Sequence, residues 1–160
     1  MLFESAKIGE TRPVVNIKVE GKTYQRTAPY LVGREKIREF ALAVKSSSAT
    51  SLDLFAAQTA GYPDLVAPPT FAVVIQERSL TTVLSDSEAD IDFTRVVHGD
   101  QRFIHARPIV AGDELTSELT VASVKSLGAH SMVTFETKIF DIADHLVCTA
   151  ISTLVVRGDE

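Results

Sequence analysis

The sequence predicts an α+β fold in which an antiparallel sheet packs against one long helix. Hydrophobic residues recur with a helical period only in the first half of the 160-residue chain. The longest apolar run, residues 70–84, follows the two prolines Pro68 and Pro69. From residue 91 onward, apolar and polar residues alternate with the period of a strand. Helices that precede a run of strands are typical of α+β domains in which the sheet packs on a helix.

The composition fits one domain over residues 1–160, with a polar tail at residues 157–160. Hydrophobic residues make up 45% of the chain and charged residues 23%, as in ordinary globular proteins. The net charge of -5, without a basic block, argues against a nucleic-acid partner. The single cysteine, Cys148, excludes an internal disulfide and fits a reducing compartment. Residues 1–10 do not resemble a secretory signal, and no apolar run nears the roughly 20 residues that span a membrane. We therefore expect a cytoplasmic protein without a membrane partner.

The N-terminal segments are expected to be extended. Residues 13–19 have apolar side chains at alternating positions, and a turn is expected at residues 20–22. Residues 23–32 are predicted to form a strand that Pro29 interrupts. Because proline cannot donate to a strand ladder, this strand is expected to be broken or to lie at an edge.

Two short helices are predicted next. The apolar residues of segment 34–44 share one helical face: Ile37, Phe40, Ala41 and Val44. Gly33 is a permissible N-cap, and the helix dipole favours Glu35 in the first turn. A second helix is expected over residues 52–60, ended by Gly61.

The long helix is predicted over residues 70–84. Proline is tolerated at the first helical positions because their N–H groups have no intrahelical partner. The β-branched pairs at residues 73–74 and 81–82 also permit a strand, but the length of the run and its proline start favour a helix. Apolar residues surround its first half, so that half is expected to be buried.

The second half of the chain predicts strands joined by short turns. A bulge is expected at residues 98–100, and turns at residues 107–113, 127–130 and 141–144. The strands are predicted over residues 91–95, 101–106, 114–125, 132–140 and 146–156. A sheet curled around one long apolar helix is the hot-dog architecture.

Three blocks resemble MaoC-like dehydratases, which have the hot-dog fold. Leu31–Lys45 resembles their opening helix, Ala60–Phe71 the start of their central helix, and His98–Leu115 the strand and turn that follow. The blocks come in the family's order and together span most of the chain. The chain is most similar to short actinobacterial proteins of the UPF0336 type. That branch includes subunits of the (3R)-hydroxyacyl-carrier-protein dehydratase of mycolic acid synthesis.

The resemblance implies reversible syn elimination of water from a 3-hydroxyacyl thioester. This reaction needs a base, an acid and N–H donors for the enolate oxygen of the thioester. Catalytic members supply the first two from an Asp-x-Asn-Pro-x-His motif. A His-Gly pair at the start of the central helix supplies the N–H group.

This chain departs from that pattern at each element. Counted back from the Ala67-Pro68 junction, the aspartate position holds Ser46 and the histidine position holds Ser51. A register shift of two residues places Asp53 at the histidine position, but still no histidine. The His-Gly pair is replaced by Pro68-Pro69, and proline has no N–H. Acid, base and oxyanion donor are therefore expected to be absent together.

The resemblance then implies a non-catalytic subunit that helps to shape the acyl channel of a heteromeric (3R)-hydroxyacyl-thioester dehydratase in fatty acid biosynthesis. The expected partner is a MaoC-like subunit that carries the dyad, or a second copy of this chain, and the expected ligand is an acyl-carrier-protein or coenzyme A thioester. No cofactor or metal is expected. Because the thioester lies along the central helix in relatives, the expected binding residues are Pro68, Thr70, Phe71 and Val74.

Two enzymatic alternatives remain open. His98 and His105, with Asp92 or Asp100 nearby, could serve a self-sufficient hydratase. Their spacing of seven places them on opposite faces of a regular strand, unless a bulge at Gly99 changes this. A hot-dog thioesterase or acyl-binding module is the other alternative. Its candidate carboxylates on or near the long helix are Asp53, Asp64 and Glu77.

Two other features favour structural roles. Ser46–Ser48 lack the glycines and lysine of a phosphate-binding loop and are expected to form a solvated loop. Cys148 lies in an alternating apolar strand and is expected to be buried in the core.

Overall fold

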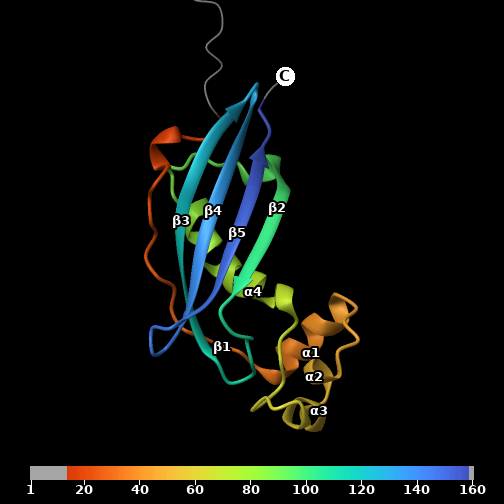
Figure 1. Cartoon of the computed structure of the whole chain (residues 1–160). Coiled ribbons are helices and arrows are strands. Elements are labelled where there is room, and N and C mark those ends of the chain that lie inside the picture. Colours follow the sequence, from red (N-terminus) through yellow and green to blue (C-terminus); the bar gives the residue numbers. More distant parts are fainter. Residues whose placement is uncertain (1–13, 159–160) are drawn as a thin grey trace, which may run out of the picture.

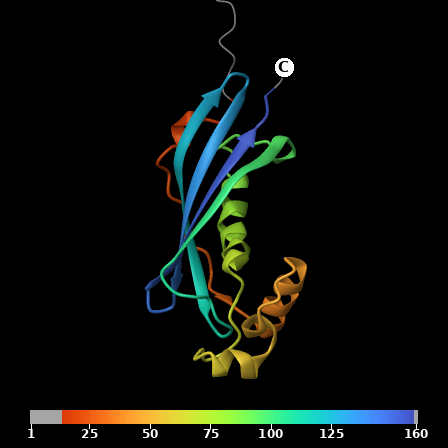
Figure 2. The same ribbon diagram turned by 45° about the vertical axis from the view of Figure 1, so that its right-hand side comes forward.

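A five-stranded antiparallel sheet curls around one helix in the computed structural model, which describes residues 14–158 (Figure 1). The strand order is β1-β3-β4-β5-β2, so β1 and β2 form the two edges. The bounds are β1 Tyr30–Leu31, β2 Val96–His105, β3 Glu114–Leu127, β4 His130–Asp141 and β5 Leu146–Val156. Helix α4, Ala72–Leu84, lies against the concave face of the sheet (Figure 2). This arrangement confirms the predicted α+β hot-dog fold.

Three short helices form a lobe beyond the start of α4 (Figure 2). They are α1 Arg34–Ala43, α2 Ala49–Leu52 and α3 Leu54–Thr59. A 3-10 turn, η2 Pro69–Phe71, leads from the lobe into α4. The helix predicted over residues 70–84 is therefore confirmed, together with its proline start.

The alternating pattern of the second half is confirmed in β3, β4 and β5. In β4, for example, Val133, Phe135 and Ile139 are fully buried while Lys138 is exposed. The register of β2 shifts between His98 and Asp100, which confirms the predicted bulge. At the other edge, Thr23 and β1 pair with β3 as separate short pieces, so segment 23–32 is a broken edge strand as expected.

Three predictions about local structure were wrong where an aspartate or asparagine side chain accepts a hydrogen bond from the backbone N–H two or three residues ahead. Asn16 accepts from the Lys18 N–H, so residues 17–19 form the 3-10 turn η1 rather than part of an alternating strand. Asp53 caps α3 and divides the single helix expected at residues 52–60. Asp92 caps the 3-10 turn η3, Phe93–Arg95, where a strand was expected over residues 91–95. Such local bonds compete with helix and strand ladders.

Other differences concern the ends of elements. Val44 is the C-cap of α1 and is 46% exposed, so it does not share the buried face of Ile37 and Ala41. Pro13, residues 1–10 and the last two residues of the predicted tail at 157–160 lie outside the described residues. Within residues 14–158, no helix has the length and apolar character needed to cross a membrane.

Candidate functional site

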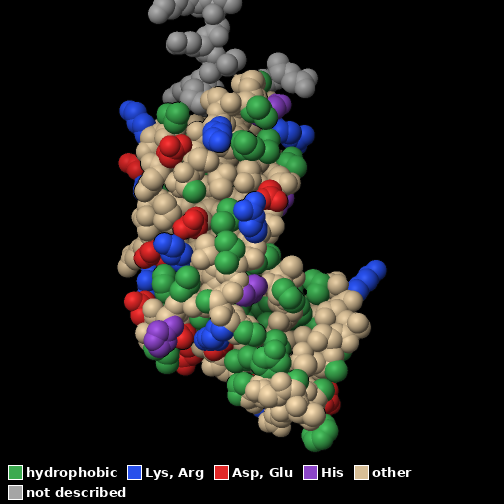
Figure 3. Space-filling model, viewed as in Figure 1, with side chains coloured by type: hydrophobic (Ala, Val, Ile, Leu, Met, Phe, Trp, Pro, Cys, Tyr) green, Lys and Arg blue, Asp and Glu red, His purple; other side chains and the backbone are tan. Residues whose placement is uncertain are grey.

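A pocket of about 460 Å³ lies where the helical lobe meets the end of β2. Figure 3 shows the surface hollowed beside this lobe. One wall carries the hydroxyls of Ser46, Ser48, Thr50 and Ser51, the floor is residues 66–69, and the opposite wall is residues 105–109. The volume is in the range of small-molecule sites.

Backbone hydrogen bonds fix the two walls to each other. Val66 forms a bridge with Val110, and the Ala67 N–H donates to the Ile109 carbonyl over 2.8 Å. The Val66 N–H in turn donates to the Thr50 carbonyl over 2.9 Å. Residues far apart in the sequence thereby form one preformed pocket.

Ser46 and Ser51, the two dyad positions implied by the resemblance, both line this pocket. Ser51 is 2% exposed, and its hydroxyl donates to the Val66 carbonyl over 2.6 Å. The Ser46 hydroxyl accepts from the Ser48 N–H. The Asp53 carboxylate accepts from the Ala56 N–H over 2.7 Å as the cap of α3. The hydrogen bonds of the two serines thus hold the loop together, and the nearby carboxylate, that of Asp53, caps α3.

Of the four residues expected to bind substrate, Pro68 lines the pocket and the other three lie elsewhere. Phe71 is fully buried in the core, Val74 is half-buried against that core, and Thr70 is exposed. Pro68 and Pro69 together start η2 and α4, and neither has a backbone N–H to donate.

His105 is the one histidine on the pocket wall among the residues described. Its Nε2 lies 2.8 Å from the Pro69 carbonyl oxygen. Because a carbonyl only accepts, Nε2 carries a hydrogen, and in the neutral ring Nδ1 is then the acceptor. An imidazole in this tautomer has one nitrogen able to act as a base.

His98 does not join His105 at the pocket. His98 pairs with Leu154 and His105 with Cys148, so the bulge does place both on the helix-facing side of β2. Seven residues of strand still separate them by roughly 20 Å.

Cys148 is fully buried in the core, as expected, and burial raises the pKa of its thiol to about 11.

The alternative carboxylates also lie away from the pocket lining. Asp64 accepts three hydrogen bonds from Arg34, and this pairing holds the pKa of Asp64 below its usual range. Glu77 is exposed on α4, and Asp100 is exposed on β2. The hydroxyl and backbone N–H of Thr94 bond to Asp92 and lower its pKa.

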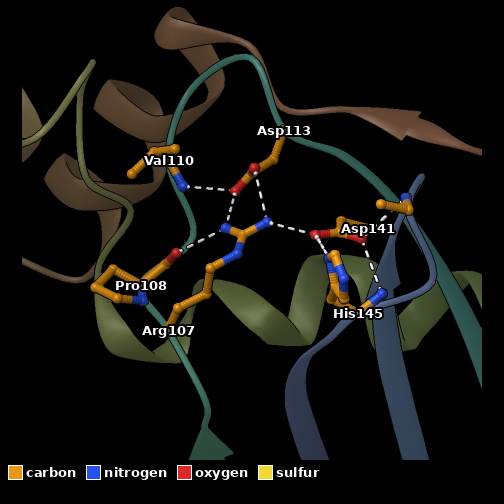
Figure 4. Close-up of polar contacts among 7 residues, drawn as sticks. Arg107, Pro108, Val110, Asp113, Asp141 and His145 are labelled. Atoms are coloured by element: carbon orange, nitrogen blue, oxygen red, sulfur yellow. Dashed lines mark hydrogen bonds and ion pairs between the residues drawn. The ribbon is translucent and has the colours of Figure 1, made fainter.

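Arg107, which sequence analysis placed only in a turn, anchors the opposite wall (Figure 4). Its guanidinium donates to both carboxylate oxygens of Asp113 over 2.8 and 3.0 Å, which raises the pKa of Arg107. Asp113 also accepts from the Val110 N–H, and Asp141 lies 3.5 Å from the guanidinium. The ion pair closes the loop between β2 and β3 and ties it to the turn after β4. The sequence predicted only a turn over residues 107–113 here.

Residues 14–158 contain no group of three or more His, Cys, Asp or Glu side chains arranged to hold a metal ion. The pocket chemistry available within them is therefore that of hydroxyls, backbone carbonyls, one imidazole and one paired guanidinium.

Comparison with known proteins adds the family context. The sequence model of the family described as "FAS1-like, dehydratase domain region" matches residues 18–150. A UPF0336 protein of Leifsonia xyli subsp. xyli is 61% identical over 146 residues, which cover 91% of this chain and 98% of that protein. A C-terminally truncated HadBC (3R-hydroxyacyl-ACP dehydratase) complex from Mycobacterium tuberculosis has a chain that is 30% identical, with a TM-score of 0.76. That match covers 86% of this chain and 96% of the other. A structure titled "MaoC-like dehydratase" is 33% identical with a TM-score of 0.74, covering 88% of this chain and 42% of the other.

Proposed function

Because the chain belongs to the FAS1-like dehydratase-region family and to its UPF0336 group, we propose that it is a non-catalytic subunit of a heteromeric (3R)-hydroxyacyl-thioester dehydratase. In this role it completes a double hot dog and shapes the acyl channel. A MaoC-like partner supplies the catalytic aspartate and histidine. The substrate is an acyl-carrier-protein or coenzyme A thioester of cytoplasmic fatty acid biosynthesis.

The proposal rests on the residues that line the pocket at the start of the central helix. Serines that line the pocket stand at both positions that the resemblance assigns to the dyad, and the buried one, Ser51, already donates to the Val66 carbonyl. Pro68-Pro69 cannot supply the N–H that an enolate oxygen needs. Loss of general acid–base groups alone typically costs about 10²–10⁴-fold in rate. The pocket remains preformed, which fits a role in binding or shaping rather than in proton transfer.

The free edge of the sheet supports the need for a partner. β2 is an edge strand whose backbone pairs with β5 on one side. Val97 and Ile104 on this strand are 47% and 55% exposed. Edge strands with apolar side chains are readily extended by another strand. His105 and the pocket lie at the end of the same strand, so a hot-dog subunit paired there adjoins the pocket.

The test is expression of the chain alone and together with a dyad-bearing MaoC-like protein encoded nearby. Each preparation is assayed for hydration of (2E)-enoyl thioesters. The proposal expects turnover only in the co-purified complex. Robust turnover by the single chain would remove it.

His105 favours a second candidate, a self-sufficient hydratase with an unfamiliar acid–base arrangement. It is the one imidazole lining the pocket among the residues described, and its Nε2–H is oriented by the Pro69 carbonyl, which leaves Nδ1 as the acceptor of the neutral ring. This candidate requires activity in the single chain that His105→Ala abolishes. The thioesterase alternative has no such support, because Asp64 is held by Arg34 and Asp53 caps α3.

A further inference from the structure

A stripe of polar side chains crosses the buried interface between α4 and the sheet. It starts at the edge strand β2 and ends at β3. Every member except Gln101 has at most 3% of its surface exposed. The members of this polar stripe are Gln101, Ser152, Gln76, Thr137, Ser79 and Ser117.

The strand register shows that the stripe runs diagonally. Gln101 of β2 lies opposite Ser152 of β5. Thr137 of β4 lies opposite Ala150, one inward position further along than Ser152. Ser117 of β3 lies opposite Ile139, again one inward position further. Diagonal neighbours on one face lie about 7–8 Å apart, a distance that a long side chain or a bridging water spans.

The stripe separates the hydrophobic core into two clusters. Phe71, Ile75 and Cys148 belong to the cluster next to the pocket. Leu80, Val83, Phe135 and Leu154 belong to the cluster at the far end of α4. The polar stripe is therefore a continuous layer between them.

The β3 end of the stripe is satisfied by protein groups. The Ser79 and Ser117 hydroxyls lie 2.8 Å apart, and the Ser117 hydroxyl also lies 3.2 Å from the Thr27 hydroxyl. Gln76, one helical turn before Ser79, donates from Nε2 to the Ser152 hydroxyl over 3.1 Å. These bonds hold α4 in register with β3 and β5.

At the β2 end of the stripe, polar side-chain atoms of the described residues lack such hydrogen-bond partners. Among the residues described, Oε1 and Nε2 of Gln101 and Oγ1 of Thr137 are buried without a hydrogen-bond partner. A buried polar group left unpaired costs about 1–3 kcal/mol, and native proteins pair nearly all such groups with protein or ordered water. Three unpaired atoms in one half of the stripe therefore indicate a ligand that the protein atoms do not supply.

We propose that this end of the stripe is an internal water site between Gln101 and Thr137. Their strands lie two apart and their positions are offset by one inward step along the strand, or about 12 Å at the usual spacings, so a long side chain and one or two waters span the gap. The amide of Gln101, the hydroxyl of Ser152 and the hydroxyl of Thr137 supply the two to four polar partners that a buried water requires. Water completes the hydrogen-bonded layer from one side of the sheet to the other.

The experiment compares near-isosteric apolar variants of the full chain, Gln101→Met and Thr137→Val. Thermal unfolding gives their stability, and water magnetic relaxation dispersion counts internal waters of long residence. Gln76→Met is the control, because the amide of Gln76 donates to a protein group, the Ser152 hydroxyl. Loss of that hydrogen bond should lower the unfolding temperature in the same assay.

The water site predicts that Gln101→Met and Thr137→Val each lower the unfolding temperature by about 2–4 °C, the effect of one hydrogen bond in a domain of this size. Each is also expected to remove long-lived water from the relaxation signal. A dry stripe gives an unchanged or raised unfolding temperature, because removing an unpaired polar group is neutral or stabilising. That result, or a loss of stability with an unchanged water count, overturns the proposal.

Discussion

Nε2 of His105 lies 2.8 Å from the carbonyl oxygen of Pro69, so the edge strand β2 is hydrogen-bonded to the start of the central helix. The contact joins the floor of the pocket to the wall formed by residues 105–109. Pro69 accepts this hydrogen bond through its carbonyl and, as a proline, has no N–H to donate. The relationship shows how the wall of the pocket is held to the start of the central helix.

Under the proposed non-catalytic role, in which His105 holds a wall of the pocket and transfers no proton, His105→Ala in the active complex is expected to lower turnover less than tenfold. His105→Gln, which keeps an N–H donor, should restore most of the loss. Steady-state hydration of (2E)-enoyl thioesters measures both. A loss of about 10²–10⁴-fold that Gln does not rescue is the signature of a general acid or base and contradicts this role.

Ser51→Ala is expected to lower the free energy of unfolding by about 1 kcal/mol. The buried hydroxyl donates to the Val66 carbonyl over 2.6 Å, and its removal leaves that carbonyl short of one bond. Urea unfolding measures the change. Ser48→Ala is the control, because Ser48 is exposed and its hydroxyl hydrogen-bonds only to Thr50 among residues 14–158, so its effect should be close to zero.

Asp113→Asn is expected to lower the free energy of unfolding by about 1.5–3 kcal/mol, the usual range for hydrogen bonds to charged groups. The Asp113 side chain is 13% exposed and receives both arms of Arg107. Asp144→Asn is the matched control in an ion pair with Arg26, since Asp144 is 71% exposed and such pairs contribute about 0–1 kcal/mol. Equal effects in the two variants would show that the Arg107 pair does not hold the pocket wall.

Acid is expected to destabilise the protein partly through Asp86. Hydrogen bonds from Lys22 and Tyr24 lower the pKa of Asp86 to about 2. A carboxyl whose folded pKa is depressed stabilises the fold above its unfolded pKa of about 4, and this contribution is lost as the pH falls toward 2. Unfolding measured across this window should show a shallower pH dependence in Asp86→Asn than in the wild type. An unchanged slope would mean that Asp86 does not contribute.

Much of the fold could be predicted from residue periodicity, because burial imposes it. The alternation in Met132–Phe140 and the apolar run after Pro69 each correspond to one element of the structure. Periodicity did not predict the structure at Asp53 and Asp92, because each side chain accepts from a backbone N–H two or three residues ahead and starts a new turn. Periodicity contains no information about such local bonds.

The site could be predicted only in part. The spacing from Pro68 back to Ser46 and Ser51 located one wall of the pocket, since those residues are close in sequence. The opposite wall comes from the β2–β3 loop, and its anchor, the Arg107–Asp113 pair, depends on how that loop folds. His98 and His105 looked equivalent in the sequence, but only His105 reaches the pocket among the described residues.

The measurement that most directly tests the central claim is the hydratase activity of three preparations of the complex. One has both subunits intact, one carries an alanine at the partner's catalytic histidine, and one carries His105→Ala in this chain. The account predicts that the partner variant is inactive and that the His105 variant retains more than a tenth of the activity. Activity that survives in the partner variant but is lost with His105 would contradict the account and make this chain the catalyst.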